Sequence, residues 1–164
     1  MPLSDRPLAR WPTFDQARAR LQGLTAVVLD PDVESSGRIF VGLGQVGMQV
    51  RLARRFVAAL QLLEEVKPDL LLAAPRLTDG DVLELFTRLA PARSPRLVAL
   101  GGPLGRPAER RLAAAGCRIL IRKPIDLRLF AQELACHLMD RRNATPAPEN
   151  GAPAAKTVPG SRGG

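Results

Sequence analysis

Apolar and amphipathic segments alternate along the middle of the chain. Short, mostly apolar runs such as TAVVLD (25–30) and DLLLAA (69–74) are typical of buried strands. Between them apolar residues recur at helical spacing, as with Phe56, Leu60 and Leu63. The predicted strands are 25–30, 48–52, 69–74, 96–100 and 118–122. The predicted helices are 13–22, 35–46, 55–66, 79–90, 107–115 and 126–139.

Strands and helices in regular alternation indicate a parallel sheet, because a helix supplies the crossover between parallel neighbours. With helices on both faces, we expect an α/β, flavodoxin-like, doubly wound five-stranded sheet of order 2-1-3-4-5. In such a fold an active site lies outside the carboxyl ends of strands 1 and 3.

The two ends of the chain differ from this middle part. Residues 1–23 form an N-terminal extension whose short helix, N-capped by Thr13, we expect to lie on the domain or to be loosely attached. Residues 24–140 form the domain. Residues 141–164 are rich in Pro, Ala and Gly without periodicity, which predicts a disordered tail.

Composition and charge narrow the function classes. The chain has 164 residues, 46% of them hydrophobic and 4% aromatic, so an aliphatic core fits helices packed on a parallel sheet. The net charge is +8, but residues 24–140 carry only +3 of it. A nucleic-acid-binding protein concentrates its basic residues on one face or helix. We therefore expect solvated basic ends and no specific nucleic-acid binding.

Cysteine and histidine usage suggests no metal or redox site. Cys117 and Cys136 lie in apolar surroundings and are predicted to be buried free thiols in a reducing compartment. His137 is the single histidine, and we expect it to be partly exposed on the last helix. The N-terminus has no apolar run long enough for a signal peptide, and no stretch of 18 apolar residues occurs, so we expect no membrane span and a cytoplasmic location.

Three motifs occur in order along the domain. They are VVLDPD at 27–32, KPDLLLAAP at 67–75 and ILIRKPID at 119–126. Together they resemble the receiver domain of bacterial two-component response regulators, over residues 24–140. The resemblance implies phosphoryl transfer from a histidine kinase to an aspartate after strand 3. Acids after strand 1 would hold Mg²⁺, a Lys would balance the phosphoryl charge, and a Thr or Ser after strand 4 would transmit the signal.

The chain departs from this pattern at several of these positions. The acceptor position falls on Ala74, or on Ala73 if the register slips by one, and a methyl group cannot be phosphorylated. Pro31 stands where the family usually has an acid, Gly101 takes the hydroxyl position, and Leu120 replaces a common aromatic. The residual receiver pocket that we predict consists of Asp30, Asp32, Gly101, Lys123 and Pro124.

Within that pocket we expect no metal, an ion pair between Asp30 and Lys123, and a cis bond before Pro124. One alternative keeps phosphorylation but moves it to an acid such as Asp79. We expect Asp79 and Asp81 instead to cap the helix that follows strand 3.

A second alternative rests on the GxGxxG motif formed by Gly42, Gly44 and Gly47. A nucleotide- or dinucleotide-binding enzyme would place a strand at 38–41 and a helix at 48–60 around this motif. The favoured interpretation is that these glycines end the first helix of the domain.

The leading hypothesis is a stand-alone, non-enzymatic pseudo-receiver that acts as a protein-interaction or adaptor module. Its partner would be a histidine kinase, another receiver or a second copy of the chain, and no cofactor or small-molecule substrate is expected. The resemblance places the interaction face on the helix 107–115, the strand 118–122 and the helix 126–139. The basic residues of that face are Arg106, Arg110, Arg111, Arg122 and Arg128.

Overall fold

The structure is a computed structural model of the whole chain, and it describes residues 11–89, 95–102, 104–117 and 119–139. Five parallel strands form one sheet in the order β2-β1-β3-β4-β5, as predicted. The strands are β1 (Thr25–Leu29), β2 (Gln49–Ala53), β3 (Leu70–Ala73), β4 (Arg96–Gly101) and β5 (Ile119–Arg122). The predicted tail, 141–164, lies outside the described residues.

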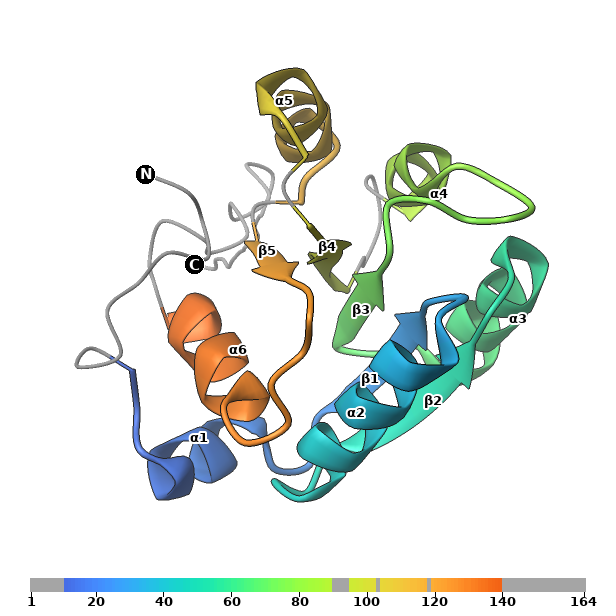
Figure 1. Cartoon of the computed structure of the whole chain (residues 1–164). Helices are drawn as coiled ribbons and strands as arrows, with labels where there is room; N and C mark the ends of the chain where they lie inside the picture. Colours follow the sequence, from blue (N-terminus) through green and yellow to red (C-terminus); the bar gives the residue numbers. More distant parts are fainter. Residues whose placement is uncertain (1–10, 90–94, 103, 118, 140–164) are drawn as a thin grey trace, which may run out of the picture.

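Six helices surround the sheet (Figure 1). Their bounds are α1 (Phe14–Leu21), α2 (Val33–Gly44), α3 (Phe56–Val66), α4 (Val82–Leu89), α5 (Arg106–Ala114) and α6 (Phe130–Met139). One face of the sheet is covered by α1, α2 and α6, and the other by α3, α4 and α5. This arrangement is the doubly wound fold that the alternation of elements predicts.

The central strands are apolar on both sides because both faces of the sheet are covered. In β1, Val28 faces the core under α2 and α6, whereas Val27 and Leu29 face the core under α3 and α4. In β3, Leu72 and Leu71 divide in the same way. A strand with a period of two therefore contributes to two separate cores.

The N-terminal helix α1 packs against α6. Thr13 and Gln16 form a reciprocal capping box at its start, with the Gln16 amide donating to the Thr13 hydroxyl at 3.2 Å. Ala17 and Leu21 are fully buried in the same core as α2 and α6. Of the two arrangements left open by the sequence, α1 therefore lies on the domain; the division of the chain into extension, domain and tail stays a prediction.

The GxGxxG motif does not follow a strand, so the dinucleotide-binding interpretation is wrong. Residues 38–41 are part of α2, and β2 begins at Gln49. Gly42 faces the loop before α6, where an added Cβ would meet the Leu127 carbonyl oxygen at 3.5 Å. Gly47 has φ of +82° and turns the chain into β2. The glycines serve the helix end and its turn, because the run IFVGLG completes a helix instead of a strand.

The cysteines and the histidine are all buried. Cys117 and Cys136 are buried and form no disulfide, as predicted. Burial raises the pKa of the Cys117 thiol to about 11. The prediction of a partly exposed His137 is wrong, since only 1% of this residue is exposed. The reason is that α6 carries α1 on its surface and is not an outer layer of the molecule.

Candidate functional site

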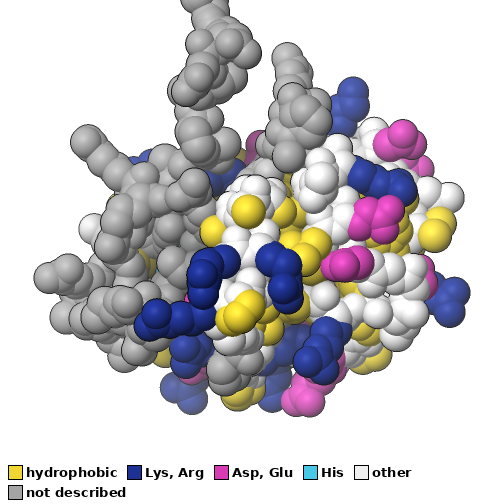
Figure 2. Space-filling view, turned by 90° about the horizontal axis from the view of Figure 1, so that it is seen from above, with side chains coloured by type: hydrophobic (Ala, Val, Ile, Leu, Met, Phe, Trp, Pro, Cys, Tyr) yellow, Lys and Arg dark blue, Asp and Glu magenta, His cyan; other side chains and the backbone are white. Residues whose placement is uncertain are grey.

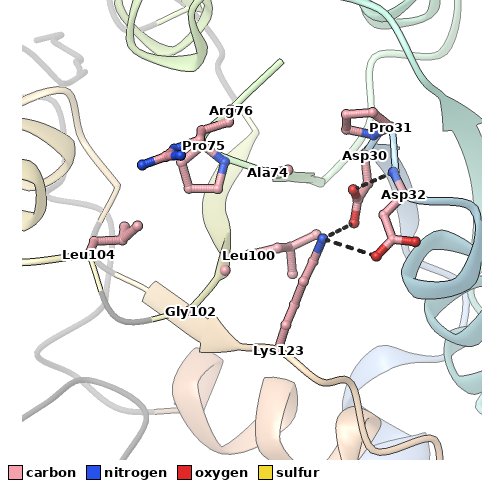
Figure 3. A pocket seen from close by; sticks show the side chains of 11 residues that line it. Asp30, Pro31, Asp32, Ala74, Pro75, Arg76, Leu100, Gly102, Leu104 and Lys123 are labelled. Carbon is pink, nitrogen blue, oxygen red and sulfur yellow. Dashed lines mark hydrogen bonds and ion pairs between the residues drawn. The ribbon is translucent and has the colours of Figure 1, made fainter. Parts of the chain in front are cut away.

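A pocket of about 530 Å³ opens at the carboxyl ends of β1, β3, β4 and β5 (Figure 3). The lining residues follow the ends of these strands, where a doubly wound sheet places its site. They are Asp30, Pro31, Asp32, Ala74, Pro75, Arg76, Leu100, Gly101, Gly102, Leu104 and Lys123. Four predicted pocket residues thus meet here, whereas Pro124 does not line the pocket.

Asp30 and Lys123 form the predicted ion pair. The Lys123 ammonium lies 2.8 Å from Asp30 Oδ2 and 4.0 Å from Asp32 Oδ2. The Asp30 side chain is 1% exposed, and that of Lys123 is 23% exposed. The Lys123 amide donates to the Gly101 carbonyl at 3.0 Å, and the Lys123–Pro124 bond is cis, as predicted. A buried carboxylate thus has its counter-charge supplied from β5.

Asp32 is committed to the start of α2. Its Oδ1 accepts from the Glu34 amide at 3.0 Å and its Oδ2 from the Ser35 hydroxyl at 2.9 Å. Its own amide donates to Asp30 Oδ1 at 2.9 Å. The Ser35 hydroxyl, followed by the backbone amides and the Lys123 charge, lowers the pKa of Asp32. Asp32 therefore works as an N-cap, which is a structural role.

The acceptor position is occupied by alanine. Ala73 ends β3 inside the core under α3 and α4, and Ala74 is the residue that lines the pocket. The Ala74 amide donates to the Leu29 carbonyl at 2.9 Å, which continues the β1–β3 pairing one step. The carboxyl end of β3 therefore presents a methyl group where phosphoryl transfer needs a carboxylate nucleophile.

The hydroxyl and aromatic positions have also lost their functional groups. Gly101 has no side chain, and a Cβ there would lie 3.3 Å from Cδ of Pro75, so the proline closes this side of the pocket. Leu120 is buried in the core on the α3–α5 side of the sheet. The pocket therefore has no hydroxyl at the end of β4.

Asp79 is not in this pocket. Its Oδ1 accepts from the Phe56 amide at 2.8 Å and so caps α3. This corrects the prediction that Asp79 caps the helix after strand 3. Asp81 fills that role, since its Oδ1 accepts from the Leu83 amide at 2.9 Å in α4. The loop folds back on α3 because Gly80 packs flat on the Phe56 ring, where a Cβ would come within 2.6 Å.

The Mg²⁺ that the resemblance implies does not fit these residues. Magnesium needs several hard oxygen ligands. Asp30 is paired with Lys123, Asp32 caps α2, and position 74 carries no carboxylate. Within the described part of the chain, no three His, Cys, Asp or Glu side chains lie close enough to hold a metal ion.

Sequence reasoning missed the remaining pocket walls. Arg76, Pro75 and Leu104 come from the segments that follow β3 and β4. Arg76 follows Ala74 by two positions, as Asp32 follows Asp30. This equal spacing is the sequence signal that could have identified it. Leu104 belongs to a loop whose path depends on tertiary packing.

The arginines of the predicted interaction face are exposed, whereas most of α6 is not. All five predicted arginines are exposed, namely Arg106, Arg110, Arg111, Arg122 and Arg128. They belong to α5, the end of β5 and the loop before α6. Seen from above, where α5 faces the viewer, several Lys and Arg side chains lie beside apolar ones (Figure 2). In α6 only Met139 is exposed, so α6 adds little to this face, since α1 packs on it.

Among the helices of the described residues, none combines the length and hydrophobicity required to span a bilayer. No family model and no curated protein matches the chain. Several solved structures match it, among them a receiver domain of a response regulator and two response regulators.

The signal receiver domain of a DNA-binding response regulator from Colwellia psychrerythraea is 21% identical, with a TM-score of 0.61 over 68% of this chain and 94% of that one. A chemotaxis response regulator of Vibrio cholerae is 16% identical, with a TM-score of 0.60 over 68% and 95%. An orphan response regulator of H. pylori is 15% identical, with a TM-score of 0.60 over 68% and 93%. By the order of its strands and its likeness to these structures, the chain has the fold of a response-regulator receiver domain.

Proposed function

We propose that this protein is a receiver-like module of bacterial two-component signalling that works without phosphorylation. The observation that carries the proposal is the pocket itself: Ala74 stands at the acceptor position while Lys123 is paired with Asp30 at 2.8 Å. A nucleophile, a metal site and a signalling hydroxyl are each missing from it. Loss at separate points of one mechanism favours a domain kept for its shape and surface.

In this proposal the module is non-catalytic, cytoplasmic and binds a protein. The partner is a histidine kinase, another receiver or a second copy of the chain. The exposed arginines of α5 (Arg106, Arg110 and Arg111), with Arg122 and Arg128, form the contact face. Clustered guanidinium groups favour an acidic partner surface and accelerate the encounter with it.

The first test is chemical. The intact chain is incubated with acetyl phosphate and Mg²⁺ and weighed by intact mass spectrometry, beside a receiver domain that keeps its aspartate. We expect the control to gain one phosphoryl group and this chain to gain none. A gain on this chain contradicts the proposal, and its loss in Asp79→Asn would assign the shifted acceptor.

The second test concerns the partner. We expect a pull-down with the intact chain to retain a histidine kinase, a receiver protein or a second copy, identified by mass spectrometry. Reversing Arg106, Arg110 and Arg111 to Glu should abolish that retention. The matched control reverses three exposed arginines in and directly after β2, on the opposite edge of the sheet: Arg51, Arg54 and Arg55. Equal loss in both variants would show a general charge effect and remove α5 as the contact face.

A further inference from the structure

The pocket at the carboxyl ends of the strands is large enough for an organic molecule. Its volume of about 530 Å³ falls within the roughly 300–1,000 Å³ of small-molecule sites. Much of the wall is apolar and comes from Pro31, Ala74, Pro75, Leu100 and Leu104. In Figure 3, Pro75 and Leu104 lie on the side away from Asp30 and Asp32, with Ala74 between.

The polar groups of the pocket favour an anion over a cation. Both carboxylates are already engaged, Asp30 by Lys123 and Asp32 by the first turn of α2. The Lys123 ammonium has three N–H donors, and of the two pocket carboxylates only Asp30 lies within hydrogen-bond distance of it, since Asp32 Oδ2 is 4.0 Å away. The partly exposed ammonium therefore has donor capacity left for a ligand.

Arg76 adds a second cation to the same pocket. It is exposed, and its side chain extends along Pro75 on the side opposite the two acids (Figure 3). Relative to a pocket with a carboxylate at position 74, Ala74 removes one negative charge and Arg76 supplies a positive one. The substitution that prevents phosphoryl chemistry thus shifts the pocket's charge toward binding an anion.

We propose that this pocket binds, without covalent chemistry, a small organic monocarboxylate. Lys123 binds the carboxylate, the apolar body lies against Leu100, Pro75 and Leu104, and Arg76 adds a positive charge on the far side of the pocket (Figure 3). The inference rests on the proposed function, because a phosphorylated pocket would have no room for such a ligand. A phosphate dianion fits less well, since Asp30 and Asp32 would repel it with no divalent cation between them.

The test is a titration of the full-length ¹⁵N-labelled chain with 2-naphthoate, followed by amide NMR. We expect saturable shifts confined to the pocket, at Ala74, Gly101, Gly102 and Lys123. The neutral analogue 2-naphthamide should bind at least about fivefold more weakly, and acetate, which has the charge but no apolar body, should not saturate. A fivefold loss is what one partly exposed charge contact contributes.

Two variants locate the ligand. Arg76→Gln removes a positive charge from the far side of the pocket and should weaken 2-naphthoate binding about twofold, whereas Arg51→Gln, on β2, should leave it unchanged. Ala74→Leu places a larger side chain in the middle of the pocket, between Pro75 and Asp30, and should remove the shifts. Thermal melting of each variant checks that it is folded.

Three outcomes would overturn the proposal: no saturable shift with 2-naphthoate, equal affinity for the neutral amide, or binding that survives Ala74→Leu. The acetyl phosphate experiment is read separately. A phosphorylated chain would defeat the proposed function, whereas a silent titration of an unphosphorylated chain would defeat only the ligand.

Discussion

The side chain of Asp30 is buried, and its carboxylate depends on the Lys123 ammonium 2.8 Å away. A buried ion pair need not add net stability, but removing one partner leaves an uncompensated charge in the protein interior, which solvates it poorly. Receiver chemistry would use both groups around a phosphoryl group. Here they hold each other, so the pair is a structural element of the pocket.

Lys123→Gln is therefore expected to lower the free energy of unfolding by about 2 kcal/mol at pH 7, measured by urea denaturation. The value lies below the roughly 3–5 kcal/mol of a fully buried pair because Lys123 is 23% exposed and water screens part of the interaction. The neighbouring, exposed Arg122→Gln should cost less than about 0.5 kcal/mol. Equal effects of the two variants would contradict a specific role of the pair.

The burial of Cys117 predicts how the stability of the fold changes at alkaline pH. Burial raises its pKa from 9.0 to about 11, so the folded state keeps the thiol proton that the unfolded state loses first. Stability from this group is full below pH 9 and is lost as the pH rises from 9 to 11. Between pH 9 and pH 11, the free energy of unfolding should fall less in Cys117→Ala than in the wild type, by on the order of 2 kcal/mol, as measured by urea denaturation. Parallel curves for both proteins would exclude this contribution.

Among the elements, α1 is the one that the structure adds to the core of the domain. The periodicity around Phe14, Ala17 and Leu21 predicts the helix, and the capping box with Gln16 fixes its start. Packing then decides its role, because Leu21 joins the core shared by α2 and α6. A hydrogen bond also connects α6 to the residues before α1, since the Gln132 side chain donates to the Pro12 carbonyl at 2.9 Å.

Leu21→Ala should therefore lower the free energy of unfolding by about 2–4 kcal/mol, as for other fully buried leucines. Arg18→Gln, exposed on the same helix, is the matched control and should change it by less than about 0.5 kcal/mol. Chemical denaturation followed by circular dichroism measures both. A near-neutral Leu21→Ala would mean that α1 is only an appendage.

At the scale of the whole molecule, the sheet joins two cores. One lies under α1, α2 and α6 and the other under α3, α4 and α5. Adjacent residues of β1 and β3 enter opposite cores, so neither core can form without the same strands. Cooperative unfolding of both cores follows from this shared sheet.

A single transition is the expected result when urea unfolding is followed by two probes. Fluorescence of Trp11, the only tryptophan, reports the segment before α1, and far-ultraviolet circular dichroism reports all the helices. The two midpoints should coincide in the wild-type chain and in Leu21→Ala. An earlier fluorescence transition would show that α1 detaches before the domain unfolds.

The sequence alone determined the strand order, the element types and the absence of a carboxylate at position 74. The element types and the missing nucleophile follow from local rules, since runs such as DLLLAA are typical of a strand buried on both faces and a methyl group cannot attack phosphorus. The strand order was expected from the alternation of strands and helices. The Asp30–Lys123 pair was also predictable, because both residues follow strand ends that meet at one edge of the sheet. Residue type and chain position suffice for such features.

Only the tertiary structure decided which long-range contacts these elements make. It buried His137 of α6, joined Asp79 to α3 instead of α4, and brought Arg76, Pro75 and Leu104 around one cavity. The physical reason is the same in each case. These positions depend on loop paths and on packing between segments far apart in the chain, and neither leaves a periodic signal in the sequence.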